Sequence, residues 1–380
     1  MRFDSGILNH CGEIKGYPRI EEWKNSAQLL ESLGFTAIWV AEHHFFWDGW
    51  TNPVPTNPIL FAAFIASLTK RLRIAQCGVC LPDWHPIRVA EDIAMADHMS
   101  GGRVEFGALR GTNNRVNGNF NRNADRRNQA VNQELFWETL EIIQLAWKGE
   151  PFKFKGKYYE IPVPGWFDKA TPREDLDRRF FTEEGELTHL ELVPLPLQKP
   201  TPPMWIMAES EKSNAEAARR GLGVLSYAQS FEQMRAAWTA YRKAFQPSGT
   251  TPRERLAIMR PIFVARTQAE AEAVMRPAIN SMMQSGPRRN ADPINAKKLF
   301  LARCEQLDDV DTKSDWFDFL VRRGHVHVGS PEYVTDRLKR FQTELGCEHF
   351  VLHWAVPQIT FEQYKSSLTL FSERVMTQFL

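Results

Sequence analysis

The sequence predicts an α/β fold, a single (β/α)8 TIM barrel in which eight parallel strands are each followed by a helix. Strand-like and helical runs alternate along nearly the whole chain, which is the pattern of a parallel sheet covered by helices. Eight strand-like runs can be counted. The 380 residues, 43% of them hydrophobic, can bury one large core with insertions. Length alone would also fit two domains, but the count favours one domain over residues 1–380.

The first half of the chain supplies four of the strands. We expect them at residues 2–8, 35–41, 72–81 and 103–109, with helices at 19–33, 58–68, 86–99 and 128–147. Gly34 ends the first helix as a C-terminal stop, while Pro58 and Pro86 stand in first turns, where a missing N–H does no harm. Because the helix at 58–68 is apolar on nearly every side, we expect it to face another subunit as well.

The second half supplies four more strands and two long insertions. Strands are expected at 204–208, 224–227, 256–265 and 350–353, with helices at 212–220, 232–245, 268–283, 331–345 and 361–376. The insertion at 151–203, after strand four, is rich in Pro and aromatic residues and is interpreted as a hairpin at 152–161 plus an irregular segment. The polar segment at 284–328, after strand seven, predicts a mobile lid with one short helix at 315–322.

Composition favours a small-molecule partner in the cytoplasm. The formal net charge is +1, from 47 basic and 46 acidic residues, so no general field would attract nucleic acid or an anionic membrane. The N-terminus lacks a signal-peptide pattern, and no apolar run is long enough to span a bilayer. Five irregularly spaced cysteines suit a reducing compartment. Cys77 and Cys80 form a C-x-x-C within a strand, where they would point to opposite faces, so we expect no redox pair.

Glu42-His43-His44 follows the second predicted strand, and barrel enzymes carry their chemistry at such strand ends. The alternative is a polar triplet that is merely solvated or hydrogen-bonded. Adjacent His43 and His44 point to opposite faces and cannot share a metal. Since the first strand has no His-x-His, and His325-Val-His327 lies in an insertion, we expect no metal site.

A phosphate site is predicted at the same edge of the barrel. Arg110 stands between small residues at the end of strand four and can form two bonds to a phosphate, unless a neighbouring carboxylate pairs with it. Ser210 and Ser213 lie three residues apart at a helix start, where they either bind phosphate or form an ordinary cap. Neither G-x-G-x-x-G nor G-x-x-x-x-G-K-[ST] occurs, so a phosphate-bearing cofactor would be held in the barrel mode.

Ordered motifs run along nearly the whole chain and resemble those of the bacterial luciferase-like flavin monooxygenases, in particular the luciferase α subunit. They are Val40-Ala41-Glu42-His43-His44-Phe45, Leu81-Pro82 with His85-Pro86 and Ala90-Glu91-Asp92, Met99-Ser100-Gly101-Gly102-Arg103, Phe106 to Gly111, Ala208-Glu209-Ser210, Gly329-Ser330-Pro331-Glu332, and the last helix.

This resemblance implies a barrel that uses reduced FMN and O2, through a C4a-peroxyflavin, to oxygenate a small organic molecule. The aromatic residues suggest an apolar or aromatic substrate, with loop packing under the insertion as the alternative: Phe45, Phe46, Trp47, Trp50, Trp84, Tyr227 and Trp354. The apolar helix at 58–68 favours a homodimer. A separate NAD(P)H-dependent flavin reductase would supply the reduced FMN. His43 matches the family's catalytic histidine, Cys77-Gly78 its non-proline cis peptide, and 284–328 its mobile loop. The expected cofactor-binding residues are Glu42, Cys77, Gly78, Leu109, Arg110, Glu209, Ser210 and Ser213, and the expected substrate-pocket residues are His44, Phe46, Trp47, Trp84, His85, Tyr227 and Trp354.

Two departures favour ordinary oxygenation over light emission. Leu109 stands where luciferase has a cysteine, and the insertion at 151–203 is longer. Two alternatives stay open: a deazaflavin-dependent dehydrogenase of the same fold, and a non-catalytic flavin-binding subunit like luciferase β, against which the intact His43 and Arg110 weigh. The residues do not separate hydroxylation, Baeyer–Villiger insertion and dehalogenation.

Overall fold

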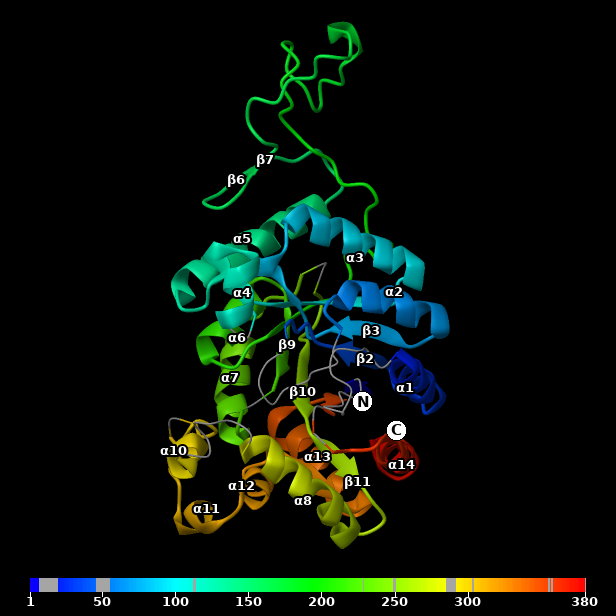
Figure 1. Ribbon diagram of the computed structural model, residues 1–380, viewed down its shortest axis with the longest axis vertical. Helices are drawn as coiled ribbons and strands as arrows, with labels where there is room; N and C mark the ends of the chain where they lie inside the picture. Colours follow the sequence, from blue (N-terminus) through cyan, green and yellow to red (C-terminus); the bar gives the residue numbers. More distant parts are fainter. Residues whose placement is uncertain are drawn as a thin grey trace.

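Eight parallel strands close into a barrel surrounded by helices in the computed structural model (Figure 1). The structure describes residues 1–6, 20–45, 55–111, 114–227, 229–248, 251–284, 292–302, 304–354, 356 and 358–379. The order β3-β2-β1-β13-β10-β9-β8-β5 is closed by pairing of β3 with β5, which confirms the predicted fold class. The barrel strands are β1 (Arg2–Gly6), β2 (Ala37–Val40), β3 (Arg73–Gln76), β5 (Val104–Leu109), β8 (Met204–Met207), β9 (Gly223–Ser226), β10 (Leu256–Arg260) and β13 (His349–Leu352).

The covering helices begin and end close to the predicted positions because their caps are local. Asn57 caps α2 by accepting from the N–H groups of Ile59 and Leu60, and α3 ends at Gly101, whose φ is 66°. In the described residues, no helix is both long and apolar enough to cross a membrane. The helices are α1 (Ile20–Ser32), α2 (Pro58–Leu68), α3 (Pro86–Ser100), α5 (Gln129–Ala146), α6 (Glu211–Arg219), α7 (Phe231–Ala244), α8 (Gln268–Gln284), α13 (Pro331–Leu345) and α14 (Phe361–Leu370).

The side chains inside the barrel follow the two-residue alternation of its strands. Trp39, Trp205, Leu225 and Val351 belong to one buried cluster that fills the interior, and the residues between them pack outward against the helices. Below this cluster, towards the N-terminal ends of the strands, lies a group of charged side chains that we call the floor cluster. It consists of Arg2, Asp4, Arg73, Glu105 and His349.

Two runs that were each predicted as one continuous strand are divided in the structure. The run 72–81 is interrupted by a cis peptide between Cys77 and Gly78, and only a short β4 (Val79–Cys80) continues it. The run 256–265 divides at Pro261, which has no N–H for a strand ladder. After it, β11 (Ile262–Val264) leaves the barrel and pairs with β12 (His327–Gly329) in a separate sheet.

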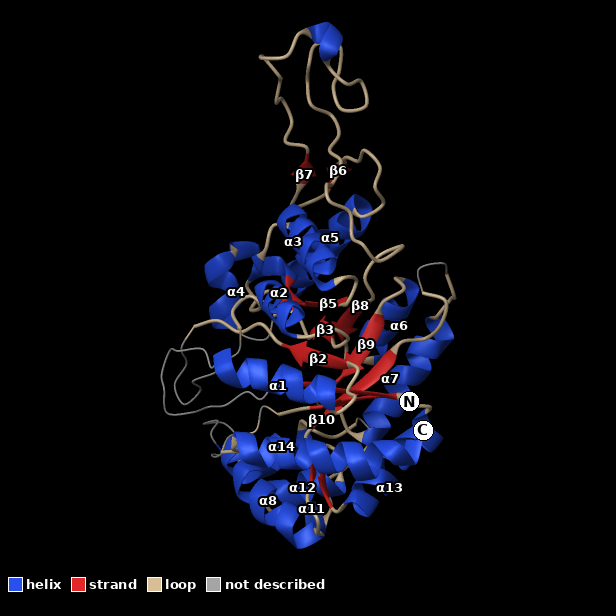
Figure 2. Cartoon of the chain, turned by 90° about the vertical axis from the view of Figure 1, so that its right-hand side faces the viewer, coloured by secondary structure: helices blue, strands red, loops and turns tan. Residues whose placement is uncertain are grey.

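The insertion at 151–203 forms an arm that projects from the flank of the barrel beyond α3 and α5 (Figure 1), as the side view also shows (Figure 2). Its predicted hairpin is present, formed by β6 (Phe154–Lys155) and β7 (Glu160–Ile161). The segment of the arm that leads back to the barrel contacts α3, where the His98 Nε2 lies 2.9 Å from the carbonyl oxygen of Leu195.

The described part of the segment 284–328 is helical rather than an open polar loop. It contains α10 (Pro293–Lys298), α11 (Asp309–Lys313) and α12 (Trp316–Arg322), of which only the last was predicted. The buried Lys297 ammonium donates to the carbonyl oxygens of Asp311 (2.6 Å) and Ser314 (2.7 Å). These bonds hold α10 against the segment that joins α11 to α12. Residues 285–291 and 303 of the predicted lid lie outside the described residues.

Candidate active site

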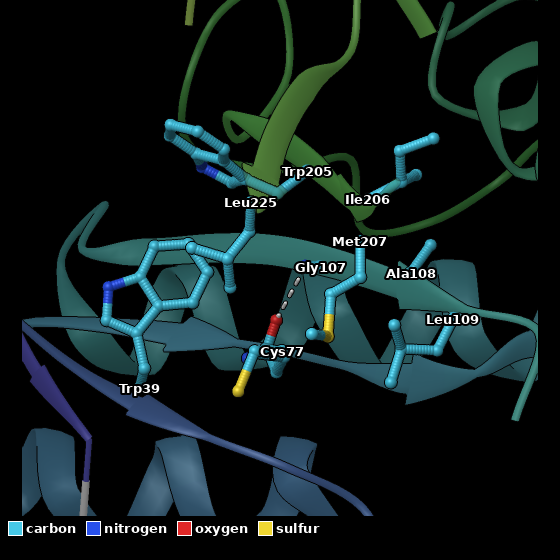
Figure 3. Close-up of a pocket in the computed structure, with 10 residues that line it drawn as sticks. Trp39, Cys77, Gly107, Ala108, Leu109, Trp205, Ile206, Met207 and Leu225 are labelled. Atoms are coloured by element: carbon cyan, nitrogen blue, oxygen red, sulfur yellow. Dashed lines mark hydrogen bonds between the residues drawn. The ribbon is translucent and has the colours of Figure 1, made fainter. Parts of the chain in front are cut away.

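A pocket opens inside the barrel where β3, β5, β8 and β9 end (Figure 3). Cys77 and Leu109, both expected to bind the cofactor, are among its lining residues, and Trp39 and Trp205 come from the buried cluster beneath it. The other lining residues are Gln76, Gly107, Ala108, Ile206, Met207 and Leu225.

Two glycines let the strands approach closely beside this pocket. A Cβ added to Gly107 would lie 1.7 Å from the carbonyl oxygen of Gln76, and one added to Gly78 would lie 2.3 Å from that of Gly107. No side chain fits either position. The expected cis peptide at Cys77–Gly78 is confirmed in the chain's geometry.

The carboxylate of Glu42 is occupied by three donors. It is 3% exposed, and it accepts from the Cys80 N–H (2.9 Å) and the Trp84 indole (3.0 Å) and pairs with the His44 Nε2 (2.7 Å). With both oxygens engaged, this side chain joins the end of β2 to the turn after β4. Its predicted role as a cofactor ligand is therefore not supported, because the carboxylate has a structural task instead.

Glu42 also belongs to a trio that resembles a metal site. Glu42, Cys80 and Asp83 bring their potential ligand atoms within 4.8 Å of one another. However, burial first and Glu42 second raise the pKa of the Cys80 thiol well above its ordinary value, so this sulfur stays protonated. With Glu42 already saturated by N–H donors, this trio carries no metal proposal.

His43 is half-buried at the end of β2, on the face of the strand that points into the barrel. Burial is the main cause that lowers its pKa, His44 adds to the effect, and Glu42 opposes it. A lowered pKa keeps the imidazole neutral at pH 7, when it can give or take one proton. The part of the chain that the structure describes offers His43 no hydrogen-bond partner.

Arg110 and a second arginine, Arg126, lie close together where β5 ends. Burial and the nearby Arg126 lower the pKa of the Arg110 guanidinium, and burial also lowers the pKa of Arg126. Arg126 donates to the carbonyl oxygen of Gly111, while its buried Nε has no partner. Within the described ranges no carboxylate pairs with either guanidinium, so the alternative reading of Arg110 as a barrel ion pair is not observed.

Arg126 was not predicted from the sequence because it lies in a polar loop, sixteen positions beyond Arg110 and beside Arg127, with no strand end to mark it. Only the fold brings it back to the end of β5.

The start of α6 lies on the neighbouring edge of the barrel. Since Ala108 pairs with Ile206 across β5 and β8, the residues two positions later, Arg110 and Ala208, reach the rim at the same height. Ser210 and Ser213 form a capping box, and their hydroxyl oxygens are 2.8 Å apart. Both hydroxyls thus serve the helix cap, at a helix end whose dipole also favours an anion. The carbonyl oxygen of exposed Glu209 accepts from Gln229.

The predicted substrate-pocket residues lie in different places. His44 packs its ring on Phe120, with centroids 4.7 Å apart, and Trp84 bonds to Glu42. His85 is exposed and contacts Tyr159 of the arm, contrary to the expectation that it faces the pocket. Phe46 and Trp47 lie outside the described residues.

Tyr227 and Trp354 lie on opposite sides of the barrel wall. Tyr227 packs against the cluster inside the barrel, at the end of β9. Trp354 is 1% exposed and lies on the outer side of the barrel wall, where its indole donates to the Ser5 hydroxyl (2.9 Å) and its ring contacts Tyr364. Trp354 is a core residue, and the prediction that it lines the pocket is wrong.

Comparisons with known proteins agree with this geometry. A family described as luciferase-like monooxygenase matches residues 1–349. The oxygenase component of the flavin-dependent trigonelline monooxygenase of Acinetobacter baylyi is 24% identical over 363 residues, 94% of this chain and 89% of the relative.

Two solved structures share the fold. The oxygenating constituent of Pseudomonas putida 3,6-diketocamphane monooxygenase, a type II Baeyer–Villiger enzyme in complex with FMN, has a TM-score of 0.72, 22% identity and coverage of 99% of this chain and 98% of that one. An F420-dependent secondary alcohol dehydrogenase has a TM-score of 0.66, 16% identity and coverage of 99% and 98%. From the match over residues 1–349, the chain belongs to the luciferase-like monooxygenase family, and it is an oxidoreductase of the monooxygenase class.

Proposed function

We propose that this protein is the oxygenase of a two-component system, which takes reduced FMN from a separate NAD(P)H-dependent flavin reductase and oxygenates a small organic molecule. One observation carries the choice of cofactor. Arg110 and Arg126 place two guanidiniums together with no carboxylate partner in the described chain, beside the N-terminus of α6. Two half-buried guanidiniums repel each other, and a phosphate bound between them would neutralise that repulsion and accept their hydrogen bonds.

The rest of the site fits a flavin bound by that phosphate. The pocket beside the cis peptide has about 140 Å³ of empty space, is lined by Cys77, Leu109 and Met207 and is floored by Trp39 and Trp205, so it presents a mainly apolar surface against which a ring system would pack. The flavin dependence of the trigonelline monooxygenase and the FMN complex of the diketocamphane monooxygenase support the same choice. A bound reduced flavin would supply the electrons that activate O2.

The residues of this chain would then control protons and water. His43, kept neutral by burial, is placed on the inner face to hold or donate a proton at the reacting oxygen. The aromatic residues at the rim would help to exclude water from that step. His43→Ala should abolish product formation while reduced FMN still binds.

The test measures binding and turnover separately. Anaerobic titration should show binding of reduced FMN, and oxygen consumption with a reductase should rise when a substrate from a panel of ketones, aldehydes and phenols is added. If reduced FMN does not bind, or if no member of the panel yields an oxygenated product, the proposal fails.

A deazaflavin-dependent dehydrogenase is the second candidate, because an F420-dependent enzyme shares the fold. This alternative predicts tight binding of the deazaflavin and hydride transfer from an alcohol without oxygen. Competition between reduced FMN and the deazaflavin in one titration separates the two functions.

We also propose that the protein is a homodimer through α2 and α3. These packed helices expose Leu60 (69%), Met95 (47%) and Met99 (62%) to solvent, an apolar face that a second copy would cover. Sedimentation should show a dimer, and Leu60→Asp should shift it towards monomer. A monomer at micromolar concentration in the wild type would contradict this proposal.

A further inference from the structure

His353, which the sequence analysis did not single out, occupies the inner face of the barrel. On β13, Val351 belongs to the cluster inside the barrel, and His349 pairs with Asp4 at 2.6 Å. The alternation that points 349 and 351 inward points 353 inward as well, one layer nearer the rim. The neighbouring Trp354 accordingly faces outward and packs on Tyr364.

The surroundings of His353 belong to the candidate active site. Its ring meets that of Tyr227 edge to face, with centroids 4.9 Å apart, and Tyr227 packs against the same inner cluster. The charge of His43 is one of the causes that lower the pKa of His353, so the two imidazoles lie within electrostatic reach of each other. His353, Tyr227 and His43 therefore come from three different strand ends and share one space.

His353 lacks the hydrogen bonds that a structural histidine has. Its Nδ1 is buried without a partner, and no side chain of the described ranges bonds to the ring. Four residues earlier on the same chain, His349 has a carboxylate within hydrogen-bond distance. A buried nitrogen without a hydrogen bond is unfavourable, so a group of this kind in the wall of a site indicates a ligand.

The charge state of His353 defines what it can bind. Burial, then Arg260, then His43 lower its pKa to about 4, which leaves the ring neutral at pH 7. Arg260 is 1% exposed and donates to the carbonyl oxygens of Met259 (2.8 Å) and Gln229 (2.6 Å), so it adds positive charge behind the ring, with no paired carboxylate among the described residues. A neutral imidazole N–H backed by positive charge suits an uncharged oxygen acceptor and disfavours a cation.

Resting on the proposed function, we infer that His353 binds the substrate by donating a hydrogen bond to an uncharged carbonyl oxygen. Tyr227 holds the ring of His353 in place, and His43 remains the proton donor. His353 thus selects the substrate, and it does not contribute to cofactor binding.

The experiment uses the full chain without cofactor, labelled with ¹⁵N-histidine, and two probes of nearly equal shape. Cyclohexanone should shift the ring signals of His353, assigned from their loss in His353→Phe, while methylenecyclohexane, which lacks the oxygen, should leave them in place. Affinity for cyclohexanone should fall roughly 3- to 10-fold in His353→Phe, the loss of one net hydrogen bond, and be partly restored in His353→Asn. His98→Phe, which replaces an exposed histidine, is the matched control. It should change neither the affinity for cyclohexanone nor the response of the His353 ring signals.

Equal responses to the two probes, or no response of His353 to cyclohexanone, would overturn the inference. Binding of reduced FMN to His353→Phe is measured alongside and should equal that of the wild type. If reduced FMN binds but cyclohexanone does not shift the His353 ring signals, only the inference about His353 fails. If the wild type does not bind reduced FMN, the proposed function fails, whatever the histidine signals show.

Discussion

The two ends of the barrel contain the same kinds of charged side chain and differ in how those charges are paired. In the floor cluster Arg2 lies 2.8 Å from Asp4, Arg73 lies 2.5 Å from Glu105, and the His349 Nε2 lies 2.6 Å from Asp4. The indoles of Trp39 and Trp205 complete the two carboxylates with bonds of 2.7 and 2.8 Å. At the rim, Arg110 and Arg126 have no carboxylate partner in the described residues.

This difference separates what holds the fold from what binds a ligand. A buried charge with all its hydrogen bonds satisfied fixes the strands that carry it. A half-buried charge without a partner reduces stability, so its presence at a strand end is explained by a ligand that binds there. The comparison predicts that substitutions in the floor change stability, whereas substitutions at the rim change binding.

Glu105→Ala should have the largest effect on stability. Removing this carboxylate takes the ion-pair partner from Arg73, one of two carboxylate partners from Arg2, and the acceptor from the Trp205 indole. Breaking a buried ion pair from one side costs about 3–5 kcal/mol of unfolding free energy. Urea unfolding followed by tryptophan fluorescence measures it. Arg88→Ala, which removes exposed helix ion pairs, is the control and should stay within about 0.5 kcal/mol. A loss below about 1 kcal/mol for Glu105→Ala would show that the floor does not hold the fold.

Acid should destabilise the two ends in different pH ranges. Burial alone would raise the pKa of Asp4, but Arg2 and His349 outweigh it and lower the pKa, so this stability is present above the ordinary carboxyl value of about 4 and is lost as the pH falls further. Because burial lowers the pKa of His353 to about 4, the unfolded chain takes up its proton first, and stability falls between about pH 6.5 and 4.

His353→Phe should therefore reduce the loss of stability between pH 6.5 and 4 and leave the steeper loss below pH 4 unchanged. Part of the loss between pH 6.5 and 4 should remain, because burial also lowers the pKa values of His325 and His327. Urea unfolding over a pH series measures both ranges. If the variant and the wild type had parallel profiles throughout, His353 would not be held neutral in the folded protein.

Trp354→Phe should have the smallest effect, and it sharpens the boundary between the barrel wall and the site. Loss of the bond to Ser5 should cost about 0.5–1.5 kcal/mol of unfolding free energy. Affinity for reduced FMN and turnover should match the wild type. A change of turnover without a change of stability would show that Trp354 lines the pocket, as was predicted from the sequence.

Much of the barrel could be predicted from the sequence because its signals are local. Pro58, Asn57 and Gly101 define helix ends by capping chemistry alone, and most of the eight strand runs are rich in apolar residues. Pro261 was a visible sign that the run 256–265 divides, since a proline interrupts a central strand. The helix α4 (Asn114–Phe120) was not predicted, because its Asn and Gly residues are poor helix formers.

The site was predicted less well because it depends on contacts between distant residues. Arg110 stands at a strand end and was found, whereas Arg126 reaches the same place from a loop. Two-residue alternation along β13, applied strictly, would have pointed to His353 instead of Trp354. No local pattern could show that Glu42 accepts from Cys80 of β4 and from Trp84 after the following turn, in addition to its neighbour His44.

Anaerobic titration of Arg110→Met with reduced FMN, paired with its urea unfolding, tests the central claim most directly. The dissociation constant should rise roughly 10- to 100-fold, the loss of charge-assisted bonds to a phosphate, while the unfolding free energy stays the same or increases because an unpaired charge has gone. An unchanged dissociation constant, together with a loss of stability like that of Glu105→Ala, would contradict the distinction between the floor and the rim.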